Sequence, residues 1–256
     1  MNRQLAVSRI DHISQALDAD GSVSVADLAT RLGVSRETIR RDIKALAGQG
    51  RANIVHGGAA RRLVNEPSLA TRVSANTAGK QAIGRQAASL VSDGMVVLID
   101  SGSTTFSMGA ALLELNDLTV ITNSLPIATM LCRAPRVKVI MLGGQIDPND
   151  EAAFGVETIA ALAHFRVDIV FLGVGGISPE GEFTDYSRLA AEQRHAMMKA
   201  GQKVYVLADH SKFEHSTPVL ITSVAHIAGL IVDELPPESI ARAASAQHWE
   251  VIVAKP

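Results

Sequence analysis

The chain has 256 residues, of which 47% are hydrophobic and 20% are charged, and its formal net charge is −2. This composition excludes a disordered chain, and the length allows one large domain or a standard domain with a smaller one. The single cysteine, Cys132, excludes an internal disulfide and a cysteine-rich zinc site. Because the sequence shows neither a signal-peptide pattern nor an apolar run of membrane-spanning length, we expect a cytoplasmic protein.

Three helical patterns occupy the start of the chain. Apolar residues with helical period predict a first helix that runs to about Asp18. Ser24-Val25-Ala26-Asp27 has the pattern of a capping box, in which Ser24 accepts from a backbone N–H and Asp27 reaches back. Gly33 ends this second helix, and Ser35 can cap a third one with the sequence SRETIRRDIKALA.

The second and third helices have the spacing of a helix-turn-helix, whose second helix enters the DNA major groove. The strand pattern from Arg51 to Val55, which ends in a glycine turn, predicts a small basic wing. Residues 1–62 contain ten Lys and Arg against six Asp and Glu, a net of +4, as expected of a segment that meets a polyanion. The third helix alone is also typical of a solvated charged face, but the combination favours DNA binding. The predicted DNA-binding residues are Ser24, Ser35, Arg36, Glu37, Thr38, Arg40, Arg41, Lys44, Arg51 and His56.

We place a winged helix-turn-helix domain in residues 1–60, a linker in 61–78 and an α/β domain in 79–256. In the last segment, short and nearly continuous apolar runs alternate with helical stretches, which predicts a doubly wound, mostly parallel sheet. The predicted strands are Val96–Ile99, Leu118–Ile121, Val137–Leu142, Ile169–Gly173, Val204–Leu207, Ile227–Val232 and Val251–Val253.

Polar and small residues follow five of these strands, at the sheet edge where such folds bind ligands. The loops are Asp100–Thr105, Thr122–Ser124, Gly143–Gly144, Gly173–Gly176 and Asp209–Lys212. Glycines and hydroxyls at a helix start can hold a phosphate, and a neighbouring carboxylate can accept from sugar hydroxyls. DSGSTT, residues 100–105, therefore predicts a cradle for the phosphate of a small sugar. The glycine pairs also fit plain turns, and Asp100 and Ser124 also fit helix caps.

The stretch SVADLATRLGVSRETIRRDIKALAGQGRANIVHGGA resembles the N-terminal domain of the DeoR family of bacterial transcriptional regulators. The resemblance continues through DSGSTT, VITNS, MLGGQ and VLADHSKF. It implies a C-terminal domain that is similar in fold to ribose-5-phosphate isomerase. It also implies that this domain responds to a phosphorylated sugar. The effector contacts that it implies, together with Gly144 from the third loop, are Asp100, Gly102, Ser103, Thr104, Thr105, Asn123, Ser124, Gly175 and Lys212. Because GEFTDYSRLAAEQRHAMM aligns ambiguously, either Asp185 or Glu192 can take a further acidic role.

We therefore predict a DNA-binding transcriptional regulator and not an enzyme. The expected protein is a repressor of a sugar or polyol catabolism operon, controlled by a phosphorylated sugar and active as a homodimer or homotetramer. The alternative is an isomerase-like sugar-phosphate enzyme with a nucleic-acid-binding appendage, in which Asp100 or Asp185 would do acid–base chemistry. His210 and His215 lack a third ligand partner in the sequence, so we expect neither a metal nor a cofactor. The effector, the operon and the sign of regulation stay open.

Overall fold

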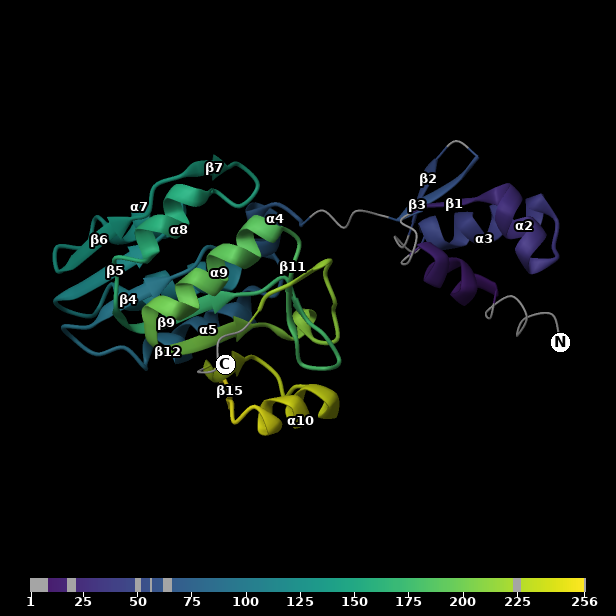
Figure 1. Cartoon of the computed structure of the whole chain (residues 1–256). Coiled ribbons are helices and arrows are strands. Elements are labelled where there is room, and N and C mark those ends of the chain that lie inside the picture. The colour runs from purple at the N-terminus through teal and green to yellow at the C-terminus, as the bar shows by residue number, and fades with distance from the viewer. Residues whose placement is uncertain are drawn as a thin grey trace. The chain divides into compact units, whose positions relative to one another are not determined.

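The computed structural model of the chain describes residues 9–17, 22–48, 52–55, 57–61, 66–222 and 227–255. The chain divides into two compact units, Met1–Val64 and Asn65–Pro256 (Figure 1). Each unit has its own hydrophobic core. This division differs from the expected linker of residues 61–78, because two helices within 66–88 belong to the second unit.

The first unit contains a helix over residues 9–17 and a small antiparallel sheet of order β1-β3-β2. Its further elements are β1 (Ser22–Ser24), α2 (Val25–Leu32), α3 (Arg36–Gly48), β2 (Ala52–Val55) and β3 (Gly58–Arg61). Ile39, Ile43 and Leu46 share one face of α3 and are buried in a common cluster with Leu28 and Ile13. This is the predicted arrangement of three helices followed by a β-hairpin wing.

Local hydrogen bonds set the ends of the two central helices. The Ser24 hydroxyl accepts from the N–H groups of Ala26 and Asp27, at 3.2 and 3.5 Å. Gly33 ends α2 with a φ of +65°, in the left-handed region that favours glycine. Ser35 accepts from the N–H of Thr38 at 3.1 Å and so begins α3. The tight turn between the helices is therefore specified by residues 33–35.

The second unit is built around a seven-stranded parallel sheet of order β15-β14-β12-β9-β4-β5-β6. Its strands are β4 (Val96–Ile99), β5 (Leu118–Thr122), β6 (Val137–Met141), β9 (Val167–Gly173), β12 (Gly201–Ala208), β14 (Ile227–Val232) and β15 (Glu250–Val253). Each predicted strand is present. The helices are α4 (Leu69–Ser74), α5 (Thr77–Ala88), α6 (Ser103–Leu112), α7 (Leu125–Leu131), α8 (Val156–Leu162), α9 (Arg188–Ala200), α10 (Glu238–Ala246) and the 3₁₀ turn η1 (His210–Lys212).

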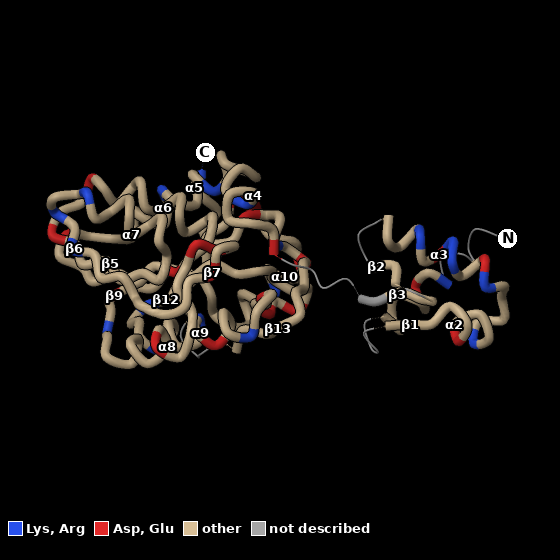
Figure 2. Tube along the Cα trace, turned by 90° about the horizontal axis from the view of Figure 1, so that it is seen from above, with Lys and Arg blue, Asp and Glu red and all other residues tan. Residues whose placement is uncertain are grey.

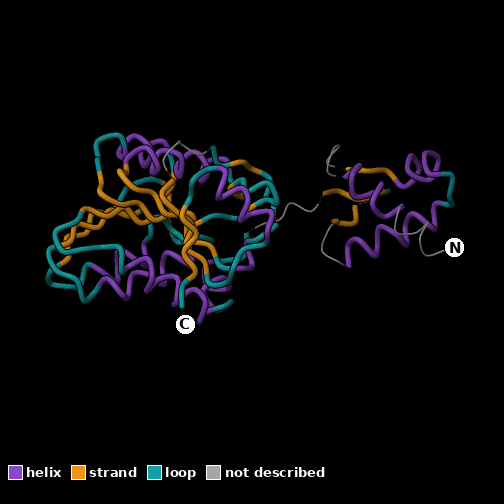
Figure 3. Tube along the Cα trace, turned by 90° about the horizontal axis from the view of Figure 1, so that it is seen from below, coloured by secondary structure: helices purple, strands orange, loops and turns teal. Residues whose placement is uncertain are grey.

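Helices cover both faces of this sheet, as Figure 3 shows. Val97 and Ile99 pack with residues of α5, α6 and α7 on one face, whereas Leu98 packs with residues of α8, α9 and α10 on the other. Both faces of the strand are buried, which explains why the strands read as continuous apolar runs. The predicted doubly wound α/β fold is therefore confirmed.

The strand order reverses direction between β4 and β9, and open α/β sheets bind ligands at the carboxyl ends of the strands beside such a switch point. Two smaller sheets stand beside the main one, a hairpin and a three-stranded sheet of order β10-β11-β13. Their strands are β7 (Gln145–Asp147), β8 (Ala152–Phe154), β10 (Gly176–Ile177), β11 (Phe183–Asp185) and β13 (Val219–Leu220). Within the described ranges, no helix combines the length and apolar character needed to cross a bilayer.

Candidate functional sites

The DSGSTT turn joins β4 to the first turn of α6. Gly102 has a φ of +147°, a conformation open to glycine rather than to other residues, and its carbonyl accepts from Thr105 Oγ1 at 3.0 Å. Ser103, Thr104 and Thr105 are buried in the first helical turn. The turn therefore places backbone N–H groups and the hydroxyls of Ser103 and Thr104 at a helix N-terminus, as a phosphate cradle requires.

Asp100, which begins this turn, belongs to a buried charged triad. Its Oδ2 accepts from Arg194 Nε at 2.7 Å and from the N–H of Gly173 at 3.2 Å. Arg194 Nη1 also pairs with the carboxylate of Asp185. Burial opposes the charge of Arg194, but the two carboxylates outweigh it and raise the pKa of Arg194 above its usual value. The triad thus holds one cation between two anions at the switch point.

The sequence left Asp185 and Glu192 as alternatives for a further acidic role, and the structure places them in different surroundings. Asp185 is buried beside Arg194. Glu192 is exposed and pairs with Arg188 at 2.8 Å, one turn earlier on the same helix. Of the two, only Asp185 lies in the site.

Asn123 and Ser124 follow β5 and have different roles. Asn123 is fully buried; its Oδ1 accepts from the N–H of Ser101 at 2.9 Å, and its Nδ2 donates to the carbonyl of Ala153 at 3.2 Å. It therefore ties the cradle to strand β8. Ser124 caps α7 by accepting from the N–H of Ile127 at 3.4 Å. This is the role of a helix cap, which the sequence offered as the alternative to an effector contact.

Two glycines allow close backbone approaches around the site. A Cβ on Gly144 would lie 2.4 Å from Thr158 Oγ1, and φ there is +146°. Gly175 donates to the carbonyl of Thr184 at 2.8 Å, and a Cβ there would lie 2.9 Å from the same oxygen. Both positions are thus explained by close packing, of Gly144 against α8 and of Gly175 against β11, and an effector contact at either stays a prediction.

Lys212 lies in η1, half-buried, after β12. Burial lowers the pKa of Lys212, while the charges of Glu66 and Asp209 act in the opposite direction. Asp209 is itself buried, with Lys80 Nζ 3.3 Å from its Oδ2. The fifth loop therefore brings one cation to the carboxyl edge and ties its first residue to α5.

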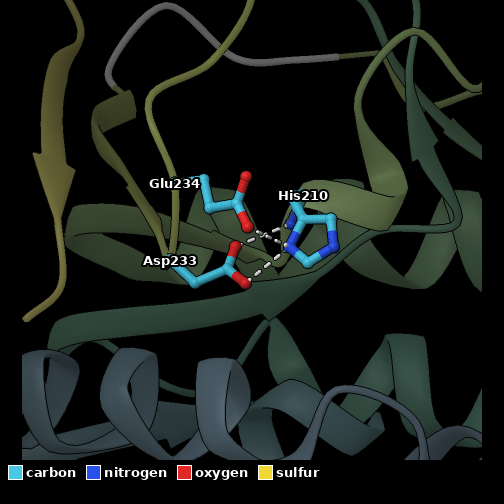
Figure 4. Close-up of side chains that lie close together, drawn as sticks. All are labelled: His210, Asp233 and Glu234. Carbon is cyan, nitrogen blue, oxygen red and sulfur yellow. Dashed lines mark hydrogen bonds and ion pairs between the residues drawn. The ribbon is translucent and has the colours of Figure 1, made fainter. Parts of the chain in front are cut away.

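Beside it, His210, Asp233 and Glu234 form a cluster that the sequence did not predict (Figure 4). His210 Nδ1 lies 2.8 Å from Asp233 Oδ2 and 3.3 Å from Glu234 Oε1, and the backbone N–H of His210 donates to Asp233 Oδ1 at 2.7 Å. The hydrogen bond to Asp233 raises the pKa of His210. Both carboxylate partners of His210 thus come from the two residues that follow β14, and Asp233 fixes the start of η1.

Sequence reasoning missed Arg194 and Lys80, although a signal was present. Arg194 shares the buried face of α9 with Ala190, Ala191 and the methionine pair 197–198. Lys80 likewise occupies the apolar face of α5. A charged residue at an apolar helical position must find a buried partner, so this spacing identifies candidates for the site.

In the first unit, α3 presents the predicted basic face. Ser35, Arg36, Glu37, Arg40, Arg41 and Lys44 are exposed, and Thr38 is half-buried. Figure 2 shows the Lys and Arg residues spread along this helix. Asp42 points inward and is paired with Arg9, whose Nε and Nη2 lie 2.5 and 3.1 Å from its carboxylate. Arg51 and His56, which we predicted in the wing, lie outside the described residues.

This basic helix, held in a helix-turn-helix and joined to an α/β unit with a buried polar edge, defines a two-domain DNA-binding regulator. The chain matches two family descriptions, a DeoR-like helix-turn-helix domain over residues 9–62 and a DeoR C terminal sensor domain over residues 75–234. The chain belongs to the DeoR family, and it is a transcriptional regulator rather than the isomerase-like enzyme of our alternative.

Several relatives are similar over nearly their whole length. The HTH-type transcriptional repressor CsqR of Escherichia coli is 32% identical, covering 96% of this chain and 94% of that protein. The glycerol-3-phosphate regulon repressor of Escherichia coli is 30% identical, covering 95% and 97%. Among solved structures, ribose 5-phosphate isomerase A of Methanocaldococcus jannaschii is 20% identical over 54% of this chain and 55% of that chain, with a TM-score of 0.39.

Proposed function

We propose that the protein represses a sugar or polyol catabolism operon. A phosphorylated sugar binds at the carboxyl edge of the sheet and controls the affinity of the protein for the operator. The observation that carries this proposal is the buried DSGSTT turn at the start of α6, with the Asp100–Arg194–Asp185 triad beside it at the switch point. The name of the glycerol-3-phosphate regulon repressor, a relative of this chain, supports a phosphorylated ligand.

In this proposal, each part of the site has a distinct task. Backbone N–H groups and the hydroxyls of Ser103 and Thr104 bind phosphate oxygens, helped by the partial positive charge of the helix start. Asn123 holds the turn in place, and the carboxylates of Asp100 and Asp185 accept from sugar hydroxyls. No cofactor takes part. A cytoplasmic homodimer or homotetramer would read paired operator half-sites with α3.

The effector must bind one conformation of the protein better than another, since a ligand with equal affinity for both shifts nothing. The first test is fluorescence anisotropy of the whole protein on DNA from upstream of its gene cluster, across a salt series and with a panel of sugar phosphates. We expect specific binding that weakens steeply with salt and that one compound changes.

Two variants separate the sites. Arg40→Ala should weaken operator binding by about 1–3 kcal/mol and leave effector-induced stabilisation intact. Thr104→Val should leave operator binding intact and remove the response to the effector. Arg85→Ala and Thr129→Val, both at exposed positions of the second unit, are the matched controls. Unchanged DNA affinity in Arg40→Ala would remove α3 as the recognition helix, and a normal response in Thr104→Val would place the effector elsewhere.

A further inference from the structure

Residues 66–75, which we call the strap, open the second unit and follow the first unit in the chain. Arg72 holds the strap together. Its Nη1 donates to Glu66 Oε1 at 2.6 Å, its Nε donates to the carbonyl of Pro67 at 2.9 Å, and its Nη2 pairs with the carboxylate of Asp150. The side chains of Arg72, Glu66 and Asp150 are only 12%, 16% and 18% exposed. This is a largely buried cluster of one cation and two anions.

One end of the strap is fixed to the β7–β8 hairpin, and the other end is fixed to the fifth loop of the predicted effector site. At its start, Leu69 donates to the carbonyl of Asn149 at 2.8 Å, and Asn149 Nδ2 donates to the carbonyl of Glu66 at 3.2 Å. At its end, Lys80 Nζ donates to the carbonyls of Arg72 and Ala75, at 2.9 and 2.5 Å, and pairs with Asp209. The strap is therefore held by the β7–β8 hairpin on one side and by the fifth loop on the other.

The strap also reaches the cradle. Helix α4 packs against α6, the helix that the DSGSTT turn begins. The hairpin that carries Asp150 continues into Ala153, whose carbonyl accepts from Asn123 Nδ2 and Gln193 Nε2, each at 3.2 Å. Between this hairpin and the start of α9 lies a cavity of about 180 Å³, lined in part by Asp150 and Ser187. Arg72 thus lies one bonded partner away from this cavity, and its partner Glu66 lies near enough to Arg194 and Asp185 for their charges to act on it.

The Arg72 cluster contains two carboxylates, of Glu66 and Asp150, and only one guanidinium. Burial, the largest influence, raises the pKa of Glu66 to about 7, against the opposing charge of Arg72. The charged groups that act on Glu66 are Arg72 on α4, Asp150 on the hairpin, Arg194 on α9 and Asp185 on β11, and the charge of Glu66 acts in turn on Tyr186 and on Lys212 of η1. Glu66 therefore titrates near neutral pH, and its neutral form releases Arg72 Nη1 for another anion.

We propose that Arg72 binds the phosphate of the effector, and that the carboxylate of Glu66 holds that place on the guanidinium in the unliganded protein. This proposal rests on the proposed function and adds to it a binding residue and a route of regulation. When a phosphate replaces Glu66 on Arg72, the strap loses the contact that closes its first turn.

The pH dependence follows from this exchange. Only the protein with a neutral Glu66 is competent, so an anion binds more tightly as the pH falls through about 7. At pH 8 roughly one molecule in ten is competent, and the apparent affinity is reduced by that fraction. Glu66→Gln is neutral at every pH and mimics the competent form.

The test is calorimetric titration of the full chain with sulfate, a tetrahedral probe that stays a dianion between pH 6 and pH 8.5. We expect Glu66→Gln to bind sulfate about tenfold more tightly than the wild type at pH 8, and equally tightly at pH 6. Glu238→Gln, an exposed change on α10, is the matched control and should follow the wild type. Arg72→Lys keeps the positive charge but loses the planar guanidinium that can bind an anion through two N–H groups. It should weaken sulfate binding at both pH values without unfolding the strap.

The outcomes distinguish this inference from the proposed function. Sulfate binding that is lost in Thr104→Val but is independent of pH and unchanged in Glu66→Gln would overturn the role of Arg72 and leave the cradle intact. Absence of any sulfate or sugar-phosphate binding by the wild type would overturn both. If the affinity for sulfate depends on pH in the wild type and not in Glu66→Gln, the exchange of Glu66 for the anion on Arg72 is supported. A merely structural role for Glu66 would not remove the pH dependence.

Discussion

Arg194 shows how a single side chain can organise a site. It brings together the end of β4 and the end of β11 by pairing with Asp100 and Asp185, and all three side chains are buried. Such a group contributes little net stability compared with a well-packed apolar core, but removal of one partner leaves uncompensated buried charge. We therefore interpret the triad as a device that fixes the geometry of the switch point.

A substitution on α9 tests the triad. Arg194→Met should destabilise the second unit by about 3–5 kcal/mol, because Asp100 and Asp185 would remain buried without their cation. Arg188→Met, on the same helix, removes a pair whose arginine side chain is 86% exposed and should cost at most about 0.5 kcal/mol. Urea unfolding followed by the fluorescence of Trp249 measures both losses. Similar values for the two variants would mean that the triad is screened by water.

At the scale of elements, short polar side chains decide where the DNA-binding helices begin. Ser24 caps α2, Gly33 ends it and Ser35 caps α3, all within twelve residues of sequence. The angle between the helices therefore depends on local hydrogen bonds as well as on the buried Ile39 and Ile43. This local control is why the sequence predicts the helix pair.

The cap of α2 can be tested separately from DNA contact. Ser24→Ala should reduce the unfolding free energy of the first unit by about 1 kcal/mol, because the N–H groups of Ala26 and Asp27 lose their acceptor. Ser24→Asp keeps an acceptor and should restore most of this loss. Far-ultraviolet circular dichroism during urea unfolding measures the change. If the aspartate variant is as unstable as the alanine variant, the hydroxyl acts through something other than the cap.

At the scale of the whole molecule, the two units have separate hydrophobic cores. The first contains residues such as Ile13 and Leu46, and the second is built on the sheet. The single tryptophan and both tyrosines of the chain belong to the second unit. Trp249 stacks on Phe183 with ring centroids 4.9 Å apart, so its fluorescence reports on the packing of that unit alone.

Two cores predict two unfolding transitions. Circular dichroism should record a transition that the fluorescence of Trp249 does not, since helices occur in both units but the tryptophan in one. Ser24→Ala should shift only the transition of the first unit, which circular dichroism alone records. Arg194→Met should shift only the transition of the second unit, which the fluorescence of Trp249 records. Coincident transitions in every variant would show that the units unfold together.

Most of the fold could be predicted because its signals are local. Apolar runs such as Val96–Ile99 and Ile227–Val232 mark strands buried on both faces, and the turn DSGSTT marks a helix start. The candidate site and the ion pairs near it were predicted less completely. Asp100 and Asn123 follow strands and could be placed by the rule for parallel sheets, whereas Glu66, Arg72 and Asp150 come from loops and a short helix that no periodic pattern identifies.

The sequence by itself determined the seven strands of the doubly wound sheet and the helix-turn-helix, because these depend on periodicity, caps and turns between near neighbours. Only the tertiary structure decided that Arg194 joins Asp100 to Asp185, that Asp185 and not Glu192 lies in the site, and that Arg72 holds Glu66 and Asp150. These ion pairs join residues as many as 94 positions apart in the chain. A buried charge pairs with whatever opposite charge the packed sheet and helices bring within reach, and spacing along the sequence does not encode that distance.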